Sequence, residues 1–386
     1  MKKTFLLSIT GVIILFVCTI AIVTSLIPKG YVDSLPIISI YNDTSAVVDC
    51  EGNLWMWGFG GGYKVDGKLG IYSYSGKPAT PQFVANDVKN VCVGRRSVLV
   101  IKNDGSLWAS GDIYWNNILN TDTLVKIMDD VKSVSSNSGT FAVIKEDGTL
   151  WTWGANNRGN LGNGSKAKSV MVPTNNPWHG IDDTPTKIMD NVKYVCMGHY
   201  NGAAIKEDGT LWTWGDNRKY MLGNDSSKDS YEPIKIMNDV DSVAVGLYCM
   251  GAVKRDGSLW MWGENLSYGM LGNDSTKAAK TPLKVMTNVK SVCIGDITTM
   301  AMKKDGSLWV WGNNNGQFAN DSIDGSKKPV KIMDNIFKFN TSDRVVSVVK
   351  EDGSVWSWGE IYYSDNIING KFRDVYHPKK VMDNVF

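Results

Sequence analysis

The chain has 386 residues, of which 15 are tryptophan and 39 are glycine, enough for a large apolar core and many tight turns. Its formal net charge is +2 and its basic residues form no long run, which argues against nucleic acid as a partner. Six cysteines and three histidines without a Cys-x-x-Cys pair argue against a metal site, and we expect no cofactor.

The N-terminal segment, residues 1–28, is strongly hydrophobic. Lys2 and Lys3 precede an apolar run over residues 5–27, which would span about 35 Å as a helix, against about 30 Å for the hydrocarbon core of a bilayer. We therefore predict one N-terminal hydrophobic helix that crosses the cell membrane. The two lysines keep the N-terminus cytoplasmic and place the rest of the chain outside. A cleaved signal peptide ending at Ser25 stays open as an alternative, and would make the protein secreted.

A short linker, residues 29–36, separates this segment from a repetitive region that fills residues 37–386. The sequence Leu54-Trp55-Met56-Trp57-Gly58 recurs, with small changes, to give seven copies in all. The other copies begin at Leu107, Leu150, Leu211, Leu259, Leu308 and Val355. Repetition at this period is typical of propellers and solenoids.

An Asp-Gly pair precedes six of the seven tryptophan motifs, and Glu51-Gly52 precedes the first. Asp-Gly between two β-rich runs is typical of a two-residue hairpin in which both central residues take positive φ. Each copy is thus expected to contain two antiparallel strands.

A further strand follows each tryptophan strand after a loop, as in Lys187 to Val192, and a short apolar strand that ends in glycine follows most of these. The last copy, Lys380 to Val385, lacks the apolar strand, whereas Ile37 to Ile40 supplies one with nothing before it. The two ends complement each other. We therefore predict an all-β, seven-bladed β-propeller closed by pairing of its N- and C-terminal segments.

The motif tryptophans are expected to be structural. Trp151 and Trp153 lie two residues apart and share one face of a strand. Thirteen exposed tryptophans would form a patch of roughly 2,000 Å², far above what soluble proteins expose, so most are expected between stacked sheets. A tryptophan-lined sugar platform is the alternative.

Cys92, Cys196 and Cys293 occupy the same position in different repeats, where other repeats have Ser135 and Ala244. We interpret this position as a slot for a small core residue. The repeats alternate around the ring, so these cysteines should lie too far apart for a disulfide.

The repeats resemble those of the regulator-of-chromosome-condensation family, whose members form seven-bladed propellers. The resemblance covers residues 37–386 and rests on Asp-Gly, on the Trp-Gly strand end and on the run from Asn156 to Gly164. Leu222-Gly223-Asn224 and Leu271-Gly272-Asn273 are similar to part of that run. The family often has histidine three residues after the glycine that ends the inner strand, where this chain has Ser97, Asn201, Cys249 and Thr298.

Nuclear members of that family include a nucleotide-exchange factor for a Ran-type GTPase that also binds chromatin. The expected membrane anchor and the near-neutral charge argue against both activities here. Some bacterial relatives are secreted and bind proteins, among them a β-lactamase inhibitor. The resemblance therefore implies a bacterial-type, extracytoplasmic, protein-binding member.

The loops after each Trp-Gly should emerge on one face of the propeller, and they contain the aromatic residues typical of protein interfaces. They span residues 59–82, 112–124, 155–186, 216–232, 264–281, 313–328 and 360–377. The candidate ligand-binding residues are Trp115, Trp178, His179, Tyr63, Tyr220, Tyr268, Tyr362 and Tyr363. The alternative is that these rings only anchor their loops.

The sequence thus predicts a binding module, not an enzyme, because it contains no catalytic motif. It would be tethered to the membrane through residues 5–27 and would recognise a protein or a cell-surface polymer through loops on one face. The alternatives are a secreted glycan-active enzyme and a secreted enzyme-inhibitor propeller.

Overall fold

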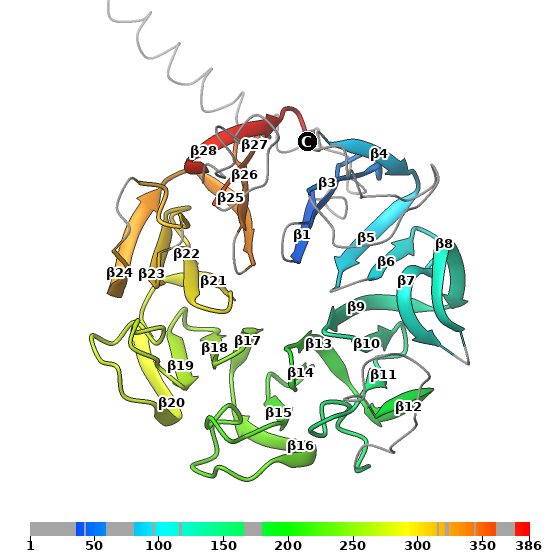
Figure 1. Cartoon of the computed structure of the whole chain (residues 1–386), viewed down its shortest axis with the longest axis horizontal. Coiled ribbons are helices and arrows are strands. Elements are labelled where there is room, and N and C mark those ends of the chain that lie inside the picture. The colour runs from blue at the N-terminus through cyan, green and yellow to red at the C-terminus, as the bar shows by residue number, and fades with distance from the viewer. Residues whose placement is uncertain are drawn as a thin grey trace, which may run out of the picture.

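The structure is a computed structural model that describes residues 36–41, 44–58, 81–94, 97–115, 118–165, 180–314, 316–320, 324–342, 345–359 and 375–386. The strands β1 to β28 form seven four-stranded antiparallel sheets arranged around a central axis (Figure 1). The predicted all-β, seven-bladed propeller is confirmed.

Each blade contains four strands that are consecutive in sequence. The innermost strands are β1 (Ile37–Tyr41), β5 (Val88–Val93), β9 (Val131–Asn137), β13 (Val192–Met197), β17 (Val240–Val245), β21 (Val289–Ile294) and β25 (Ile336–Thr341). The second strands are β2 (Thr44–Val48), β6 (Ser97–Lys102), β10 (Thr140–Lys145), β14 (Asn201–Lys206), β18 (Cys249–Lys254), β22 (Thr298–Lys303) and β26 (Val345–Lys350). The third strands, which contain the tryptophan motif, are β3 (Leu54–Gly58), β7 (Leu107–Trp115), β11 (Leu150–Ala155), β15 (Leu211–Gly215), β19 (Leu259–Gly263), β23 (Leu308–Gly312) and β27 (Val355–Gly359). The outer strands are β4 (Gln82–Ala85), β8 (Ile118–Met128), β12 (Ile181–Met189), β16 (Ser230–Met237), β20 (Ala279–Met286), β24 (Ser326–Met333) and β28 (Val375–Met382).

The antiparallel order gives the disc two different faces. The turns between first and second strands and the long connections between third and outer strands leave on one face, which we call the loop face. The Asp-Gly turns and the links between blades leave on the opposite face, which we call the turn face.

The predicted N-terminal helix, residues 1–28, lies outside the described residues, as does most of the linker 29–36. From Pro36 onward, no described helix is both long and apolar enough to cross a membrane.

The Asp-Gly hairpins differ from the predicted two-residue turn. At Asp147-Gly148 only the glycine takes positive φ, at 78°. The Gly148 N–H donates to the Lys145 carbonyl at 2.9 Å, and the Lys145 N–H donates to the Thr149 carbonyl at 2.9 Å. The loop is therefore one residue longer than predicted and ends in a glycine bulge. Asp147 therefore does not need to adopt positive φ, and its carboxylate accepts hydrogen bonds from the amide and hydroxyl of Thr149.

The first tryptophan of each motif is tied to this turn by a short chain of hydrogen bonds. In the fifth blade, the indole Nε1 of Trp260 donates to Ser258 Oγ at 2.9 Å, and Ser258 Oγ donates to Asp256 Oδ1 at 2.6 Å. The same chain recurs in all six Asp-Gly repeats. In the first blade, Trp55 donates directly to Asp49 at 2.9 Å. These first tryptophans are half-buried, less buried than predicted.

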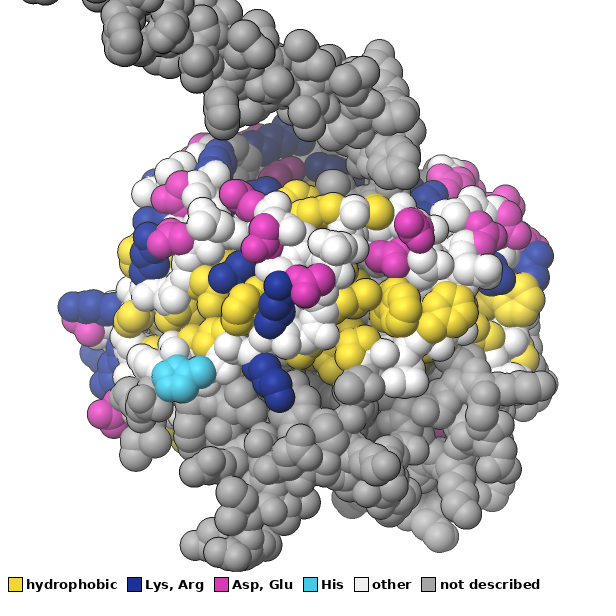
Figure 2. Space-filling view, turned by 90° about the horizontal axis from the view of Figure 1, so that it is seen from above, with side chains coloured by type: hydrophobic (Ala, Val, Ile, Leu, Met, Phe, Trp, Pro, Cys, Tyr) yellow, Lys and Arg dark blue, Asp and Glu magenta, His cyan; other side chains and the backbone are white. Residues whose placement is uncertain are grey.

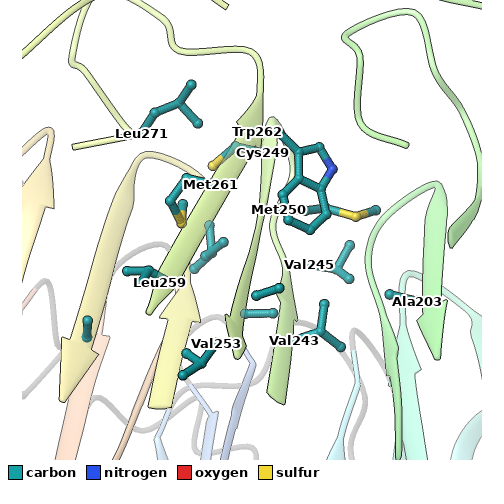
Figure 3. Packing of buried hydrophobic residues seen from close by; sticks show 14 of the residues in the cluster. Ala203, Val243, Val245, Cys249, Met250, Val253, Leu259, Met261, Trp262 and Leu271 are labelled. Atoms are coloured by element: carbon teal, nitrogen blue, oxygen red, sulfur yellow. The ribbon is translucent and has the colours of Figure 1, made fainter. Parts of the chain in front are cut away.

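The second tryptophan, which six of the seven motifs have, is buried between blades. Trp262 of β19 is 0 % exposed, and its Nε1 donates to the Met221 carbonyl in the preceding blade at 2.8 Å. Five blade junctions have such a bond. Figure 3 shows Trp262 beside Met250, on the side of its blade that faces Ala203 of the neighbouring blade. The predicted core role of these rings is confirmed.

The Leu-Gly-Asn element of one blade covers the tryptophan of the next. A Cβ added to Gly223 would lie 2.8 Å from the indole nitrogen of Trp262, and one added to Gly272 would lie 2.8 Å from that of Trp311. Glycine is needed here because the backbone must lie against the indole edge.

The ends of the chain meet, but they do not share a sheet as the sequence suggested. The first and last blades are each complete, and they close the ring by packing against each other. Trp57 and Val47 of the first blade pack with Val355 and Val385 of the last. The Cys50 N–H donates to the Val385 carbonyl at 3.1 Å. The final residues thus replace the link that joins other neighbouring blades.

Replacement of Trp262 with alanine is expected to lower the free energy of unfolding by about 3–5 kcal/mol, because it leaves a cavity and an unpaired carbonyl between two blades. Urea unfolding of the Trp262→Ala chain measures this. The control is Tyr268→Ala, which removes a ring that is 41 % exposed and should change stability by less than about 0.5 kcal/mol. Equal losses in both variants would contradict the role assigned to the buried ring.

The turn-face aspartates predict loss of stability in acid. Hydrogen bonds from the hydroxyl and amide of Ser258 hold the pKa of Asp256 below its ordinary value, and Asp104, Asp147, Asp208, Asp305 and Asp352 are shifted the same way. A pKa that is lower in the folded state contributes stability that is fully present above the unfolded value, about 3.9, and is lost as the pH falls below it. The urea midpoint should therefore fall between pH 5 and pH 3, and less steeply in Asp256→Asn. An Asp256→Asn chain with an unchanged pH dependence would oppose this.

Candidate binding face

The loop face carries the described candidate residues. Trp115 ends strand β7, and Tyr220 and Tyr268 lie in the connections after β15 and β19. Tyr63, Trp178, His179, Tyr362 and Tyr363 fall outside the described residues, so they stay predictions.

Strands β7 and β8 form the most distinctive feature of this face. They are 9 and 11 residues long, whereas the matching strands β19 and β20 are 5 and 8 residues long. The ladder continues past the length of the other blades to the pair Trp115↔Ile118. Trp115 is thereby placed at the end of a hairpin that is longer than any other pair of third and outer strands among the described residues.

The two described tyrosines differ in environment. Tyr268 is 41 % exposed, which leaves its ring accessible to a partner. Tyr220 is half-buried at a φ of 58°, and Lys280 of the next blade lies with its Nζ 5.2 Å from the ring centroid. This contact links the loop of Tyr220 to the neighbouring blade.

Buried asparagines fix the shape of these connections. Asn217 is 0 % exposed; its side chain accepts from the Leu222 N–H at 2.9 Å and donates to the Ser226 carbonyl at 2.8 Å. Asn265 makes the matching bonds in the next blade. Because the backbone is held from inside the loop, the exposed positions are preorganised for binding.

The turns between first and second strands surround the axis of the ring on the same face, and we call this position the channel mouth. These turns are two or three residues long, and the sequence interpretation did not single out any of them. Ser138, His199 and Asp296 come from three such turns and lie together, with 2.9 Å between Ser138 Oγ and His199 Nδ1. Only the closed ring brings them together. The available signal was that one of only three histidines in the chain occupies such a turn.

Charged side chains near the mouth are paired in part. Arg218 contacts Asp216 at 2.7 Å, and Lys219 Nζ lies 3.8 Å from the ring centroid of Tyr248. Burial alone would raise the pKa of Asp216, but hydrogen bonds from Arg218 outweigh it and hold that pKa below the ordinary value. Figure 2 shows acidic and basic side chains mixed along the rim of the disc, with hydrophobic side chains between them.

The cysteine slot lies on the innermost strands at the seams between blades. In two blades a serine of this slot accepts from the next blade: Ser39 from the Val93 N–H, and Ser135 from the Met197 N–H, both at 2.9 Å. The sulfur of Cys196 takes a similar bond from the Val245 N–H. The small residue in this slot thus also accepts a hydrogen bond from the backbone of the next blade.

The five described cysteines are all free. Within the described ranges, no group of three or more His, Cys, Asp or Glu side chains is placed to hold a metal ion. Burial raises the pKa of Cys196 to about 12 and also raises the pKa values of Cys92 and Cys293.

These thiols are expected to react slowly in the folded protein, because only the thiolate is nucleophilic. At pH 8, iodoacetamide should modify Cys196 at least about a hundredfold more slowly than it does in urea, and Cys92 and Cys293 should also react more slowly. Peptide mass spectrometry of timed samples measures each site. Equal rates in the folded and unfolded protein would contradict the burial assigned to the slot.

Comparison with known proteins identifies the repeat. The model of the regulator of chromosome condensation (RCC1) repeat matches residues 147–205 and 208–253, and a second RCC1 repeat model matches residues 131–160 and 192–220. No curated protein sequence matches the chain.

Solved structures share the fold. Prp20p of Saccharomyces cerevisiae, from a crystal structure that also reports its binding to Gsp1p and histones, is 17 % identical with a TM-score of 0.67, over 90 % of this chain and 88 % of that one. Yeast RCC1 (Prp20) bound to Kap60 is 19 % identical with a TM-score of 0.66, over 80 % and 78 %. Human WBSCR16 is 16 % identical with a TM-score of 0.65, over 83 % and 88 %.

Proposed function

We propose that this chain, which belongs to the regulator of chromosome condensation (RCC1) repeat family, is a protein-binding module that recognises its partner through the loop face. The observation that carries the proposal is the β7–β8 hairpin, which is longer than any other described pair of third and outer strands and has Trp115 at its end. The base of this hairpin serves the ring, because the Ile113 carbonyl accepts the inter-blade bond from Trp153. The pair Trp115↔Ile118 lies beyond that contact, and ordering these extra residues costs conformational entropy.

The form of the loop face favours a protein partner. The connections are held by buried asparagines, and they display Tyr268 on a backbone that needs no reordering on binding. Rigid aromatic side chains supply large contact areas at low entropic cost. The yeast relative is named in its structures with the protein partners Kap60, Gsp1p and histones, so propellers of this type offer protein-binding surfaces.

We also propose that the propeller is displayed outside the cytoplasmic membrane. The support is the sequence of residues 1–28, with an apolar run long enough to span a bilayer and two lysines before it. Protease added to intact cells should then digest the propeller, whereas a cytoplasmic marker protein survives. A propeller that is cut only after lysis would overturn this placement.

The binding proposal predicts that the full chain, immobilised in detergent, captures a partner from the cell envelope through its aromatic loops. Trp115→Ala combined with Tyr268→Ala should weaken capture by about 30-fold or more, since aromatic anchors each contribute about 2 kcal/mol at protein interfaces. Quantitative mass spectrometry of bound proteins measures this.

The matched control carries two substitutions on the turn face, Lys193→Ala and Lys290→Ala, at exposed positions of β13 and β21. This chain should capture as wild type does. Capture lost in the control but kept in the aromatic variant would place the interface on the opposite face.

A further inference from the structure

Three side chains from separate blades meet at the channel mouth in an arrangement known from nucleophilic catalysis. Ser138 lies between β9 and β10, His199 between β13 and β14, and Asp296 between β21 and β22. The Ser138 Oγ lies 2.9 Å from His199 Nδ1, and His199 Nε2 lies 3.8 Å from Asp296 Oδ1. A nucleophile, a base in hydrogen-bond reach and a third group that orients the base are the parts that such catalysis requires.

Asp296 lies on the Nε2 side of the imidazole, with 3.8 Å between Nε2 and Oδ1, which is longer than a hydrogen bond. Its negative charge favours the tautomer that carries the hydrogen on Nε2. Nδ1 is then the unprotonated nitrogen, and it faces the serine hydroxyl. In that tautomer Nδ1 can accept the Ser138 proton when the hydroxyl turns away from Asn137 Oδ1, to which it can also donate at 3.0 Å.

The cluster is accessible and its serine is held in place. The side chains of His199 and Asp296 are each 26 % exposed. Ser138 is half-buried in a tight turn with φ of 48°, and its hydroxyl donates to Asn137 Oδ1 at 3.0 Å. The phenol oxygen of Tyr41 lies 3.5 Å from Ser138 Oγ and adds a second polar contact to the serine.

The fold does not require this arrangement. The same turn of the fifth blade holds Leu247 and Tyr248, whose side chains offer neither a base nor a carboxylate. Repeating contacts, such as the tryptophan bonds between blades, hold the ring at five junctions. The three residues thus differ from the structural residues of the chain, which recur from blade to blade.

We propose that Ser138 is an activated nucleophile that cleaves carboxylic esters at the channel mouth. Ser138 Oγ attacks the acyl carbon while its proton passes to His199, which returns that proton to the departing alcohol. The ester C–O bond breaks and an acyl–Ser138 ester forms. A water molecule, deprotonated by His199, then attacks this ester and releases the carboxylic acid, and the proton returns to Ser138. The sum is ester plus water giving acid plus alcohol. Asp296 is a positioning residue that acts through His199.

The test uses p-nitrophenyl acetate as substrate and a fluorophosphonate as a covalent probe, on the full-length chain in detergent. We expect steady release of p-nitrophenol and a mass increase on the peptide that contains Ser138. Ser138→Gly removes the hydroxyl and tolerates the positive φ of the turn, so both signals should disappear while the melting temperature is kept. His199→Gln should slow turnover by at least about a hundredfold, the usual contribution of a general base.

Ser227→Ala, at an exposed serine of the loop face, is the matched control and should behave as wild type. Asp296→Asn should lower the rate and displace its pH profile, because it alters the base and not the nucleophile. Absence of turnover and labelling in the wild-type chain overturns the proposal. So does release that Ser138→Gly leaves unchanged, which would reveal non-specific reaction with other side chains. Neither result bears on capture of a protein partner by the aromatic loops.

Discussion

The ring depends on a buried tryptophan that, at five junctions between blades, lies beneath the loop of the blade before it. A four-stranded sheet of this size has two apolar faces and no core of its own, so it is stable only between neighbours. Trp262 supplies both parts of such a joint, a large buried ring and an indole N–H that pairs with the Met221 carbonyl. The serine and cysteine slot on the innermost strands adds a hydrogen bond between neighbouring blades at several interfaces.

This contact links the core to the surface. The element that covers the tryptophan, around Gly223, is part of a loop-face connection, so packing between blades also sets the shape of that face. The two faces then differ in kind. The turn face repeats one bonding pattern, aspartate to serine or threonine to tryptophan, in six blades. The loop face carries the departures, namely the long β7–β8 hairpin and the polar cluster around His199. We therefore expect the functional residues on the loop face, where the blades differ from one another.

Much of the fold could be predicted because one sequence motif recurs seven times along the chain. The repeated tryptophans and Asp-Gly turns indicate seven hairpins that share a core. Two details could not be predicted. The carboxylate of Asp147 bonds to Thr149 and lengthens its turn, which requires knowledge of side-chain geometry. The ring closes by packing of whole blades, since the repeat in the sequence and the blade in space begin at different strands.

The candidate site was harder to predict than the fold. Aromatic composition directed attention to the loop connections, where Tyr268 is exposed and Tyr220 contacts Lys280 of the next blade. The cluster of Ser138, His199 and Asp296 was missed because its members are separated by 61 and 97 residues and each lies in an unremarkable turn. Contacts across the axis of a closed ring leave no local pattern in a sequence.

The central claim is that the loop face is where this propeller meets its partner, and photo-cross-linking in intact cells tests it most directly. A photoreactive amino acid would replace Tyr268 on the loop face in one chain and Lys290 on the turn face in another. The account predicts a defined covalent product with another protein from position 268 and none from position 290. A product from position 290 alone would contradict it.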